Sequence, residues 1–361
     1  MVERFVCGTR IICGDGAVSA LAELDAKRVL VVTDPYFYEN GEAERVAKVT
    51  GAAQWEIFHQ VAPDPGVALA ASGTAVVRHL EPDLIVALGG GSAMDCAKAM
   101  KFFAESNARL AAVPTTSGSG SEVTDFAILT HEGVKHPLVD ESLRPGVAVL
   151  DGDFLRKLPR GLIADAGFDV LAHAVEAYVA TKAGAITDAL ARDAFCTAFA
   201  KLPESYAGNT GVRLPVHMAA TMAGMAFTQA GLGLCHALAH SLGGAFHVPH
   251  GRLNAILLPE VISYNAASAG RKYAELARAA GLGGSVETIA LRNLKNALVR
   301  LRRELGLPDS LAQAGIEPAL VRQKAGEIVA AALEDPCCET NPVKPEPAGV
   351  RALLERVTGH G

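Results

Sequence analysis

The run from Leu214 to Gly251 is the feature of this sequence that most restricts its fold, because its 38 residues include no Asp, Glu, Lys or Arg. Charged residues make up 20% of the chain, so a run of this length would ordinarily contain several. It is long enough to cross a membrane, but it contains histidines, a glutamine and two prolines, and it lacks a continuous aliphatic block. We therefore expect a pair of buried helices here, and no membrane span.

The composition of the whole chain is that of a globular protein. Its 361 residues are 50% hydrophobic, which is enough to bury a large core and excludes a disordered chain. This length favours about two domains. A net charge of −6 without any Lys/Arg cluster argues against nucleic acid as a partner.

Cysteine usage and the N-terminus bear on location. The seven cysteines form no CxxC pair, which argues against a disulfide framework and favours a reducing compartment. Residues 1–5 lack the apolar segment of a signal peptide. We therefore expect a cytoplasmic protein.

The pattern of apolar residues changes near residue 155. Before it, short apolar runs that are typical of buried strands occupy residues 28–34, 84–88, 110–113 and 147–150 and alternate with helical stretches. This alternation predicts an α/β dinucleotide-binding domain with a Rossmann-like parallel sheet over residues 1–155. Over residues 156–361, Ala- and Leu-rich helical periodicity predicts an all-α domain, with helices for example over 164–181, 216–230 and 286–305.

A glycine-rich turn follows the second predicted strand. Three glycines at positions 89–91 precede Ser92, and a helix is expected to start there. The backbone N–H groups of such a turn, with a helix N-terminus, can bind a phosphate. The same residues would also suit an ordinary turn in which Ser92 caps the helix and Asp95 completes a capping box. The usual GxGxxG dinucleotide pattern is absent, because Met94 takes the place of its last glycine.

Two further strands end in polar residues. The loop at residues 115–122 reads Thr-Thr-Ser-Gly-Ser-Gly-Ser-Glu and follows the third strand, which suggests either a second ligand-binding loop at the same sheet edge or a flexible connection. Asp34 ends the first strand before Pro35. An acid there can bind a ribose diol and would repel a 2′-phosphate, which favours NAD, although a simple turn residue explains it equally well.

Histidines gather in the charge-free run. Four of the chain's 11 histidines fall within 15 residues: His236, His240, His247 and His250. Upstream, Asp169 and His173 lie four positions apart in a helical stretch and therefore share one helix face. Buried imidazoles need polar partners, and a divalent metal is one such partner. One carboxylate with two or three imidazoles suits Fe(II) or Zn(II).

Taken in order along the chain, these motifs resemble those of the iron-containing, or group III, alcohol dehydrogenase family. The resemblance runs from Thr9 to Pro342. In length and in the segment at 134–142, the chain is most similar to the short 1-propanol dehydrogenases associated with bacterial microcompartments. The motifs are Gly89-Gly-Gly-Ser92, the segment from Pro114 to Thr124, the pairs Asp169/His173 and His236/His240, and Pro249-His250-Gly251.

The resemblance implies an architecture and a set of site residues. The architecture is similar to dehydroquinate synthase: a nucleotide-binding α/β domain, a helical metal domain, and a cleft between them. The resemblance also implies a homodimer. The implied metal ligands are Asp169, His173, His236 and His250. The implied NAD contacts are Asp34, Gly89, Gly90, Gly91, Ser92, Asp95, Thr115, Thr116, Ser119 and Lys135. The implied catalytic residue is His240, which faces the nicotinamide and substrate and relays a proton.

The implied reaction is reversible hydride transfer between NAD and a small primary alcohol or aldehyde, such as propanol/propanal or ethanol/acetaldehyde, with the metal as Lewis acid. Family membership favours Fe²⁺, since Zn²⁺ accepts the same ligands. Phe126 stands where some diol-reducing members carry a polar substrate contact, which argues against a strongly polar substrate.

Other readings stay open at this point. A dehydroquinate-synthase-like lyase would need a basic cluster for a phosphorylated, acidic substrate, and the charge-free run offers none. A zinc glycerol dehydrogenase would differ mainly in metal and ligand count. A catalytically silent metal-binding scaffold would bind a metal without turnover. Net oxidation of NADH with small aldehydes separates a dehydrogenase from the lyase, which would use NAD only transiently, and from the scaffold.

Overall fold

The computed structural model describes residues 5–131 and 134–359. Of residues 1–5, which were used to argue against a signal peptide, only Phe5 is among the described residues. The chain divides into two compact units. The α/β unit spans Val6–Leu158, and the helical unit comprises the chain from Pro159 onward together with Phe5. The sequence-based boundary between residues 155 and 156 lies close to this division.

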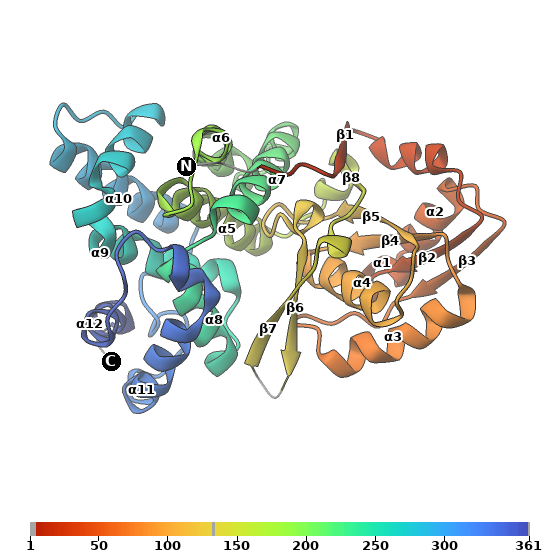
Figure 1. The fold of residues 1–361 in the computed structure, drawn as a ribbon. Coiled ribbons are helices and arrows are strands. Elements are labelled where there is room, and N and C mark those ends of the chain that lie inside the picture. The colour runs from red at the N-terminus through yellow and green to blue at the C-terminus, as the bar shows by residue number, and fades with distance from the viewer. Residues whose placement is uncertain (1–4, 132–133, 360–361) are drawn as a thin grey trace. The chain divides into compact units, whose positions relative to one another are not determined.

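A six-stranded parallel sheet forms the centre of the α/β unit (Figure 1). The strand order across the sheet is β1-β8-β5-β4-β2-β3. The strands are β1 (Arg10–Gly14), β2 (Arg28–Val32), β3 (Gln54–Phe58), β4 (Leu84–Gly89), β5 (Arg109–Pro114) and β8 (Val147–Asp151). The helices are η1 (Ala17–Leu24), α1 (Pro35–Glu39), α2 (Glu42–Val49), α3 (Val67–Leu80) and α4 (Gly91–Phe103), with short 3-10 turns η2 (Ser121–Val123), η3 (Glu141–Leu143) and η4 (Gly152–Leu155).

Both faces of this sheet are buried, which explains the continuous apolar strands. In β2, Leu30 and Val32 pack with α3 and α4 on one face. Val29 and Val31 pack with η1 and α2 on the other. Successive side chains of a strand point to opposite faces, so a strand covered twice must be apolar at every position. The predicted fold class is therefore confirmed.

The order in which successive strands join the sheet reverses at β2. β3 pairs with one edge of β2, and β4, the next strand along the chain, pairs with its other edge. In open parallel sheets, ligands bind at the carboxyl ends of the strands beside such a switch point. Asp34 follows β2 and the three glycines belong to the end of β4 and the start of α4, so both lie at this position.

Four strands were not predicted. β1 and β3 are the edge strands of the six-stranded sheet, and because they mix polar and apolar residues, a search for apolar runs does not find them. The other two, β6 (Phe126–His131) and β7 (Val134–Val139), form a separate antiparallel pair. This pair contains Lys135.

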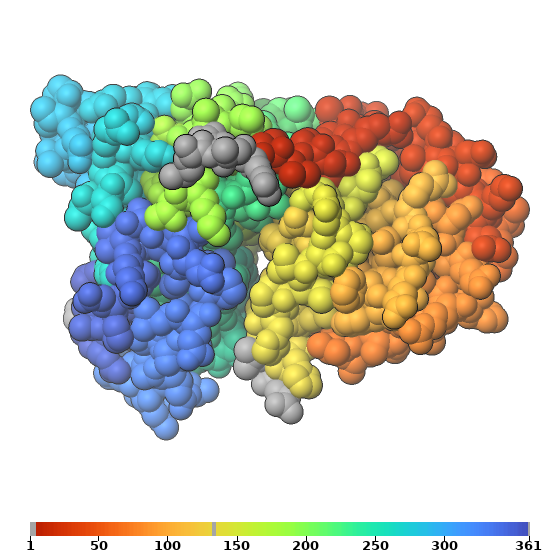
Figure 2. Space-filling view, in the orientation of Figure 1, coloured from red at the N-terminus to blue at the C-terminus, as the bar shows by residue number. Residues whose placement is uncertain are grey.

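The helical unit is built around α5 (Arg160–Val179), which is buried on almost every side from Ile163 onward. It packs against α6, α7 and α9. The remaining helices are α6 (Ala185–Tyr206), α7 (Arg213–Ala230), α8 (Leu234–Phe246), α9 (His250–Ala279), α10 (Glu287–Glu304), α11 (Pro318–Glu334) and α12 (Pro347–Thr358), with 3-10 turns η5 (Thr210–Val212) and η6 (Pro336–Thr340). Figure 2 shows the blue C-terminal segment at the surface of this unit, where α11 packs on α8 and α12 on α9.

The charge-free run forms α7, α8 and the first residues of α9, as the prediction of buried helices requires. Gly231 ends α7 with φ +82°, and His247 ends α8 with φ +55°. Within the described part of the chain, no helix has both the length and the hydropathy needed to cross a bilayer.

Candidate active site

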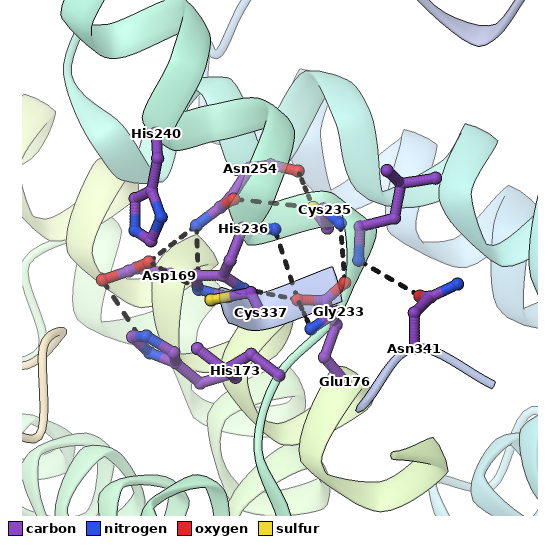
Figure 3. A network of polar contacts seen from close by, with 12 residues as sticks. Asp169, His173, Glu176, Gly233, Cys235, His236, His240, Asn254, Cys337 and Asn341 are labelled. Atoms are coloured by element: carbon purple, nitrogen blue, oxygen red, sulfur yellow. Dashed lines mark hydrogen bonds and ion pairs between the residues drawn. The ribbon is translucent and has the colours of Figure 1, made fainter. Parts of the chain in front are cut away.

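Three helices of the helical unit bring one carboxylate and three imidazoles together. Figure 3 shows three of these side chains, Asp169, His173 and His236. Asp169 and His173 come from one face of α5, His236 from α8 and His250 from the first turn of α9. Asp169 Oδ1 lies 3.7 Å from His236 Nε2 and 3.6 Å from His250 Nε2. Asp169 Oδ2 lies 3.9 Å from His173 Nδ1. All four residues predicted as metal ligands therefore converge.

The donor set and its spacing fit a divalent transition metal. Bonds of about 2.1 Å to a tetrahedral ion place ligand atoms roughly 3.4 Å apart, slightly closer than the separations in this cluster. Asp169, His173 and His236 are buried, with one ligand atom from each within 4.8 Å of the others. A hard carboxylate with three imidazoles suits Fe(II) or Zn(II). These side chains could hold such an ion with small adjustments.

The electrostatics of the cluster favour positive charge at its centre. Burial alone would raise the pKa of Asp169, but the positive charge of His173, His250 and His236 lowers it below its usual range. Burial alone would lower the pKa of His236, but the nearby carboxylates of Asp169 and Glu176 raise it to about 9. A cation bound between these rings would gain from the same carboxylates.

Glu176, also on α5, orients His236 by contacting Nδ1, the ring nitrogen that does not face Asp169. Its Oε2 lies 2.6 Å from His236 Nδ1, and both side chains are almost fully buried. The same carboxylate accepts backbone N–H bonds from Gly233, Cys235 and His236 at the start of α8. With Glu176 accepting the Nδ1 proton, a neutral His236 ring would present the lone pair of Nε2 to an ion bound beside Asp169. Sequence reasoning assigned no role to Glu176.

Asn254 orients the carboxylate of Asp169 through a hydrogen bond. It lies one turn after His250 on α9, and its Nδ2 donates to Asp169 Oδ1 at 2.8 Å. The side chain is fully buried. Each of the three helices thus supplies at least one of the converging side chains, and α5 and α9 each also supply a residue that orients one.

His240 has a different partner. Its Nδ1 lies 2.8 Å from Asp335 Oδ2, and its ring stacks on His250 with centroids 5.1 Å apart. Burial alone would raise the pKa of Asp335, but the hydrogen bond with His240 lowers it to about 2. Cys337 completes this second group, and burial raises the pKa of its thiol well above the ordinary value. Neither Asp335 nor Cys337 was predicted.

Two histidines of the charge-free run differ from expectation. His247 is exposed in the left-handed cap of α8, so the interpretation that it lines a buried site is wrong. Its position as the helix cap explains the exposure. His217 lies in the same run and was overlooked, and it is buried on α7.

In the α/β unit, the structure packs the two predicted ligand loops against each other. A Cβ atom on Gly90 would lie 3.2 Å from Thr116 Oγ1, and one on Gly91 would lie 3.1 Å from Ser119 Oγ. Side chains at these glycines would therefore push the loops apart. Thr115 N also donates to Gly89 O at 3.0 Å.

The predicted capping box at this helix is wrong. α4 begins at Gly91 with Gly90 as its N-cap, so Ser92 lies inside the first turn. Asp95 accepts from Ser121 Oγ at 2.9 Å instead of capping the helix. The N-cap is Gly90 and not Ser92, so the helix begins two residues earlier than the capping box predicts, and glycine is an acceptable N-cap without a side chain.

Two more predicted contacts have protein partners in this unit. Asp34 Oδ1 accepts from Phe37 N at 3.2 Å and so caps α1, as the turn interpretation requires. Its Oδ2 faces Gly89, 3.7 Å from where a Cβ would lie. Lys135 on β7 pairs with Asp64, with Nζ and Oδ1 2.7 Å apart, and its charge also acts on Asp95.

Comparisons with known proteins match both units. Residues 8–152 match the model "Iron-containing alcohol dehydrogenase", and residues 163–358 match "Fe-containing alcohol dehydrogenase family, C-terminal". The chain is 36% identical to 1-propanol dehydrogenase PduQ of Citrobacter freundii over 99% of this chain and 100% of that protein. It is 38% identical to aldehyde-alcohol dehydrogenase 2 of Entamoeba histolytica over 94% of this chain, but it spans only 44% of that longer protein.

The fold is also found in solved structures. The iron-containing alcohol dehydrogenase of Thermococcus thioreducens superposes with a TM-score of 0.91 at 34% identity, over 98% of this chain and 99% of that one. These similarities confirm the predicted family resemblance and the predicted enzyme class, an NAD-dependent oxidoreductase that interconverts alcohols and aldehydes. The chain belongs to the iron-containing alcohol dehydrogenase family.

Proposed function

We propose that this protein catalyses reversible hydride transfer between NAD(H) and a small, weakly polar primary alcohol or aldehyde, with propanol/propanal as the leading pair. The full-length similarity to a 1-propanol dehydrogenase supports this substrate class. The convergence of Asp169, His173, His236 and His250 carries the proposal, because it supplies a buried site for a divalent ion. Iron is favoured by family membership and zinc is the alternative.

When bound, the metal supplies the Lewis acidity that lowers the pKa of an alcohol or polarises an aldehyde, and the nicotinamide carries the hydride. Residues of the chain orient the proposed ligands and exchange the proton. Glu176 holds the Nδ1 proton of His236, and Asn254 holds one oxygen of Asp169. His240 is proposed to relay the alcohol proton: Asp335 engages its Nδ1, so Nε2 is the nitrogen that exchanges a proton.

The test is an aldehyde panel under anaerobic conditions. The protein is purified without oxygen, loaded with Fe(II) or Zn(II), and mixed with NADH and C2–C4 aldehydes. We expect NADH oxidation with propanal among the best substrates. If neither metal gives turnover with any of these aldehydes, the proposed function is refuted, and a metal-binding scaffold becomes the better description.

Asp34 is proposed to select NAD over NADP. Replacing it with glycine should lower the ratio of kcat/KM for NADH to that for NADPH by about tenfold, because 1.4 kcal/mol of charge repulsion corresponds to that factor. The variant Asp34→Asn is the matched control, since its amide oxygen can still cap α1 while its charge is gone. Equal shifts in both variants would assign the effect to charge, and an unchanged ratio in both would contradict the role.

Glu176 is expected to strengthen metal binding through His236. Glu176→Gln should weaken affinity for Zn(II) or Fe(II) by about 10- to 100-fold, the usual effect of losing a partner behind a metal-binding histidine. Competition with a coloured chelator measures this directly. Glu275→Gln is the control, because the described contacts of Glu275 are a 3.4 Å hydrogen bond from Tyr178 and a 3.8 Å ion pair with Arg271, neither of them with a predicted metal ligand. Equal metal affinities of the two variants would contradict the assignment.

The cytoplasmic location, the microcompartment association and the homodimer implied by the family resemblance stay predictions. The similarity to PduQ supports them through the family subtype only. Light scattering on the purified protein would measure the homodimer independently of activity.

A further inference from the structure

Lys98 is a fully buried cation that the proposed reaction does not use. It lies in the second turn of α4, and none of its side chain is exposed. A buried ammonium is costly unless several oxygens replace its water shell. What surrounds Lys98 therefore indicates why it is there.

Five oxygen atoms of one loop surround its Nζ. Ser121 contributes its carbonyl at 2.7 Å and its hydroxyl at 3.0 Å. Thr124 contributes its hydroxyl at 2.8 Å and its carbonyl at 3.1 Å. The carbonyl of Phe126 lies at 2.8 Å. The loop that follows the Thr/Ser-rich motif is thus wrapped around a single ammonium group.

Acidic side chains keep this ammonium charged. Burial lowers the pKa of Lys98 to about 8, and the charges of Asp95 and Glu122 oppose the decrease. At neutral pH Lys98 therefore retains its proton and all three donors. Asp95 also accepts from Ser121 Oγ, so both side chains of α4 bind the same residue of the loop.

The part of the loop just before Ser121 faces the glycine turn. Ser121 N donates to Ser119 Oγ at 3.3 Å. Ser119 is the side chain that a Cβ on Gly91 would approach within 3.1 Å. Since Gly91 begins α4 and Lys98 lies seven positions later on it, one helix carries the glycine turn at its start and holds the loop through its second turn.

We propose that Lys98 is a positioning residue for the dinucleotide: it holds the loop at residues 115–126 against the glycine turn, so that both present their N–H and hydroxyl groups to the pyrophosphate in a preformed arrangement. This inference rests on the proposed use of NAD(H). It assigns no contact between Lys98 and the ligand. The effect is expected in cofactor affinity, since a loop that must be ordered on binding weakens binding.

The test compares Lys98→Met with Lys101→Met. Both substitutions remove an ammonium from α4, but Lys101 bonds only to Ser142 O among the described contacts, at 3.1 Å. Fluorescence titration should show NADH binding weakened about 10- to 100-fold in Lys98→Met. Lys101→Met should stay within about twofold of the unmodified protein, and the metal affinity should be unchanged in both, since the metal residues lie in the other unit.

Competing ligands separate positioning from general damage. ADP-ribose, which contains the pyrophosphate, should lose affinity for Lys98→Met as NADH does, whereas adenosine should not. An equal loss for adenosine would indicate a merely structural role and overturn the proposal. So would unchanged NADH binding in a folded Lys98→Met protein.

A second variant covers the case in which Lys98→Met does not fold. Thr124→Val keeps the side-chain volume and removes one of the five oxygens. It should weaken NADH binding several-fold without affecting adenosine, and wild-type NADH affinity in this variant would overturn the proposal. If the unmodified protein binds no NADH, both the proposed function and this inference fail. If it binds NADH and the variants bind equally well, this inference alone fails.

Discussion

Replacing His250 with alanine is expected to remove bound metal and aldehyde reduction together. His250 Nε2 is one of the nitrogen atoms near Asp169 Oδ1, and its loss leaves one carboxylate and two imidazoles. We expect metal affinity to fall by more than about 100-fold, beyond the effect of losing an outer partner. Metal analysis after gel filtration and NADH oxidation with propanal measure the two losses.

The fold should survive this change, because the His250 side chain is 27% exposed and lies at the start of α9. His247→Asn is the matched control. It removes another imidazole from the same charge-free run, at an exposed position with φ +55° that asparagine tolerates. This control should keep its metal and its activity. Full metal occupancy in His250→Ala would show that His250 is no ligand.

Replacing Gly251 with alanine is expected to destabilise the helical unit severely. A Cβ atom there would lie 1.9 Å from the backbone oxygen of Asp165 on α5, and backbone cannot swing aside as a side-chain tip can. α9 would have to move away from α5, which would also strain the ion pair between Arg252 and Asp165. We expect the free energy of unfolding to fall by about 4 kcal/mol. Denaturant titration measures this.

Gly326→Ala is the control of opposite sign. Gly326 is exposed on α11, where a Cβ would meet only a side-chain tip at 3.9 Å. Alanine there should raise stability by up to about 1 kcal/mol, because glycine is a poor helix former. If Gly251→Ala is as stable as the unmodified protein, the close approach of α5 and α9 does not require glycine at position 251.

The sequence predicted the centre of the sheet and missed its edges for one physical reason. β2 and β4 are covered on both faces and read as apolar runs. The edge strand β3, Gln-Trp-Glu-Ile-Phe, has only one neighbour, β2, and most of its residues are partly or fully exposed. β3 therefore has no continuous apolar run, and its position depends on pairing with a strand far away in sequence.

Contacts between residues far apart in sequence also explain which parts of the site were not predicted. His236 and His250 are conspicuous as histidines in a run without charge, and Asp169 and His173 as a pair four positions apart in a helical stretch. The family resemblance then implied these four as the ligand set. Asn254 and Asp335 contact residues 85 and 95 positions away, so only the packing of the helices reveals them. Glu176 was within reach of sequence reasoning, because it lies three positions after His173 and so shares its helix face.

If the proposed ligands on α5, α8 and α9 bind a metal, the arrangement has a consequence for the protein's lifetime. The unfolded chain has no comparable site, so binding energy adds to the stability of the folded helical unit, by about 4 kcal/mol when free metal exceeds its Kd a thousandfold. A copy without metal is therefore the one that opens more often, and proteases that attack unfolded chains remove it first. The abundance of this protein in a cell would then follow the supply of its metal.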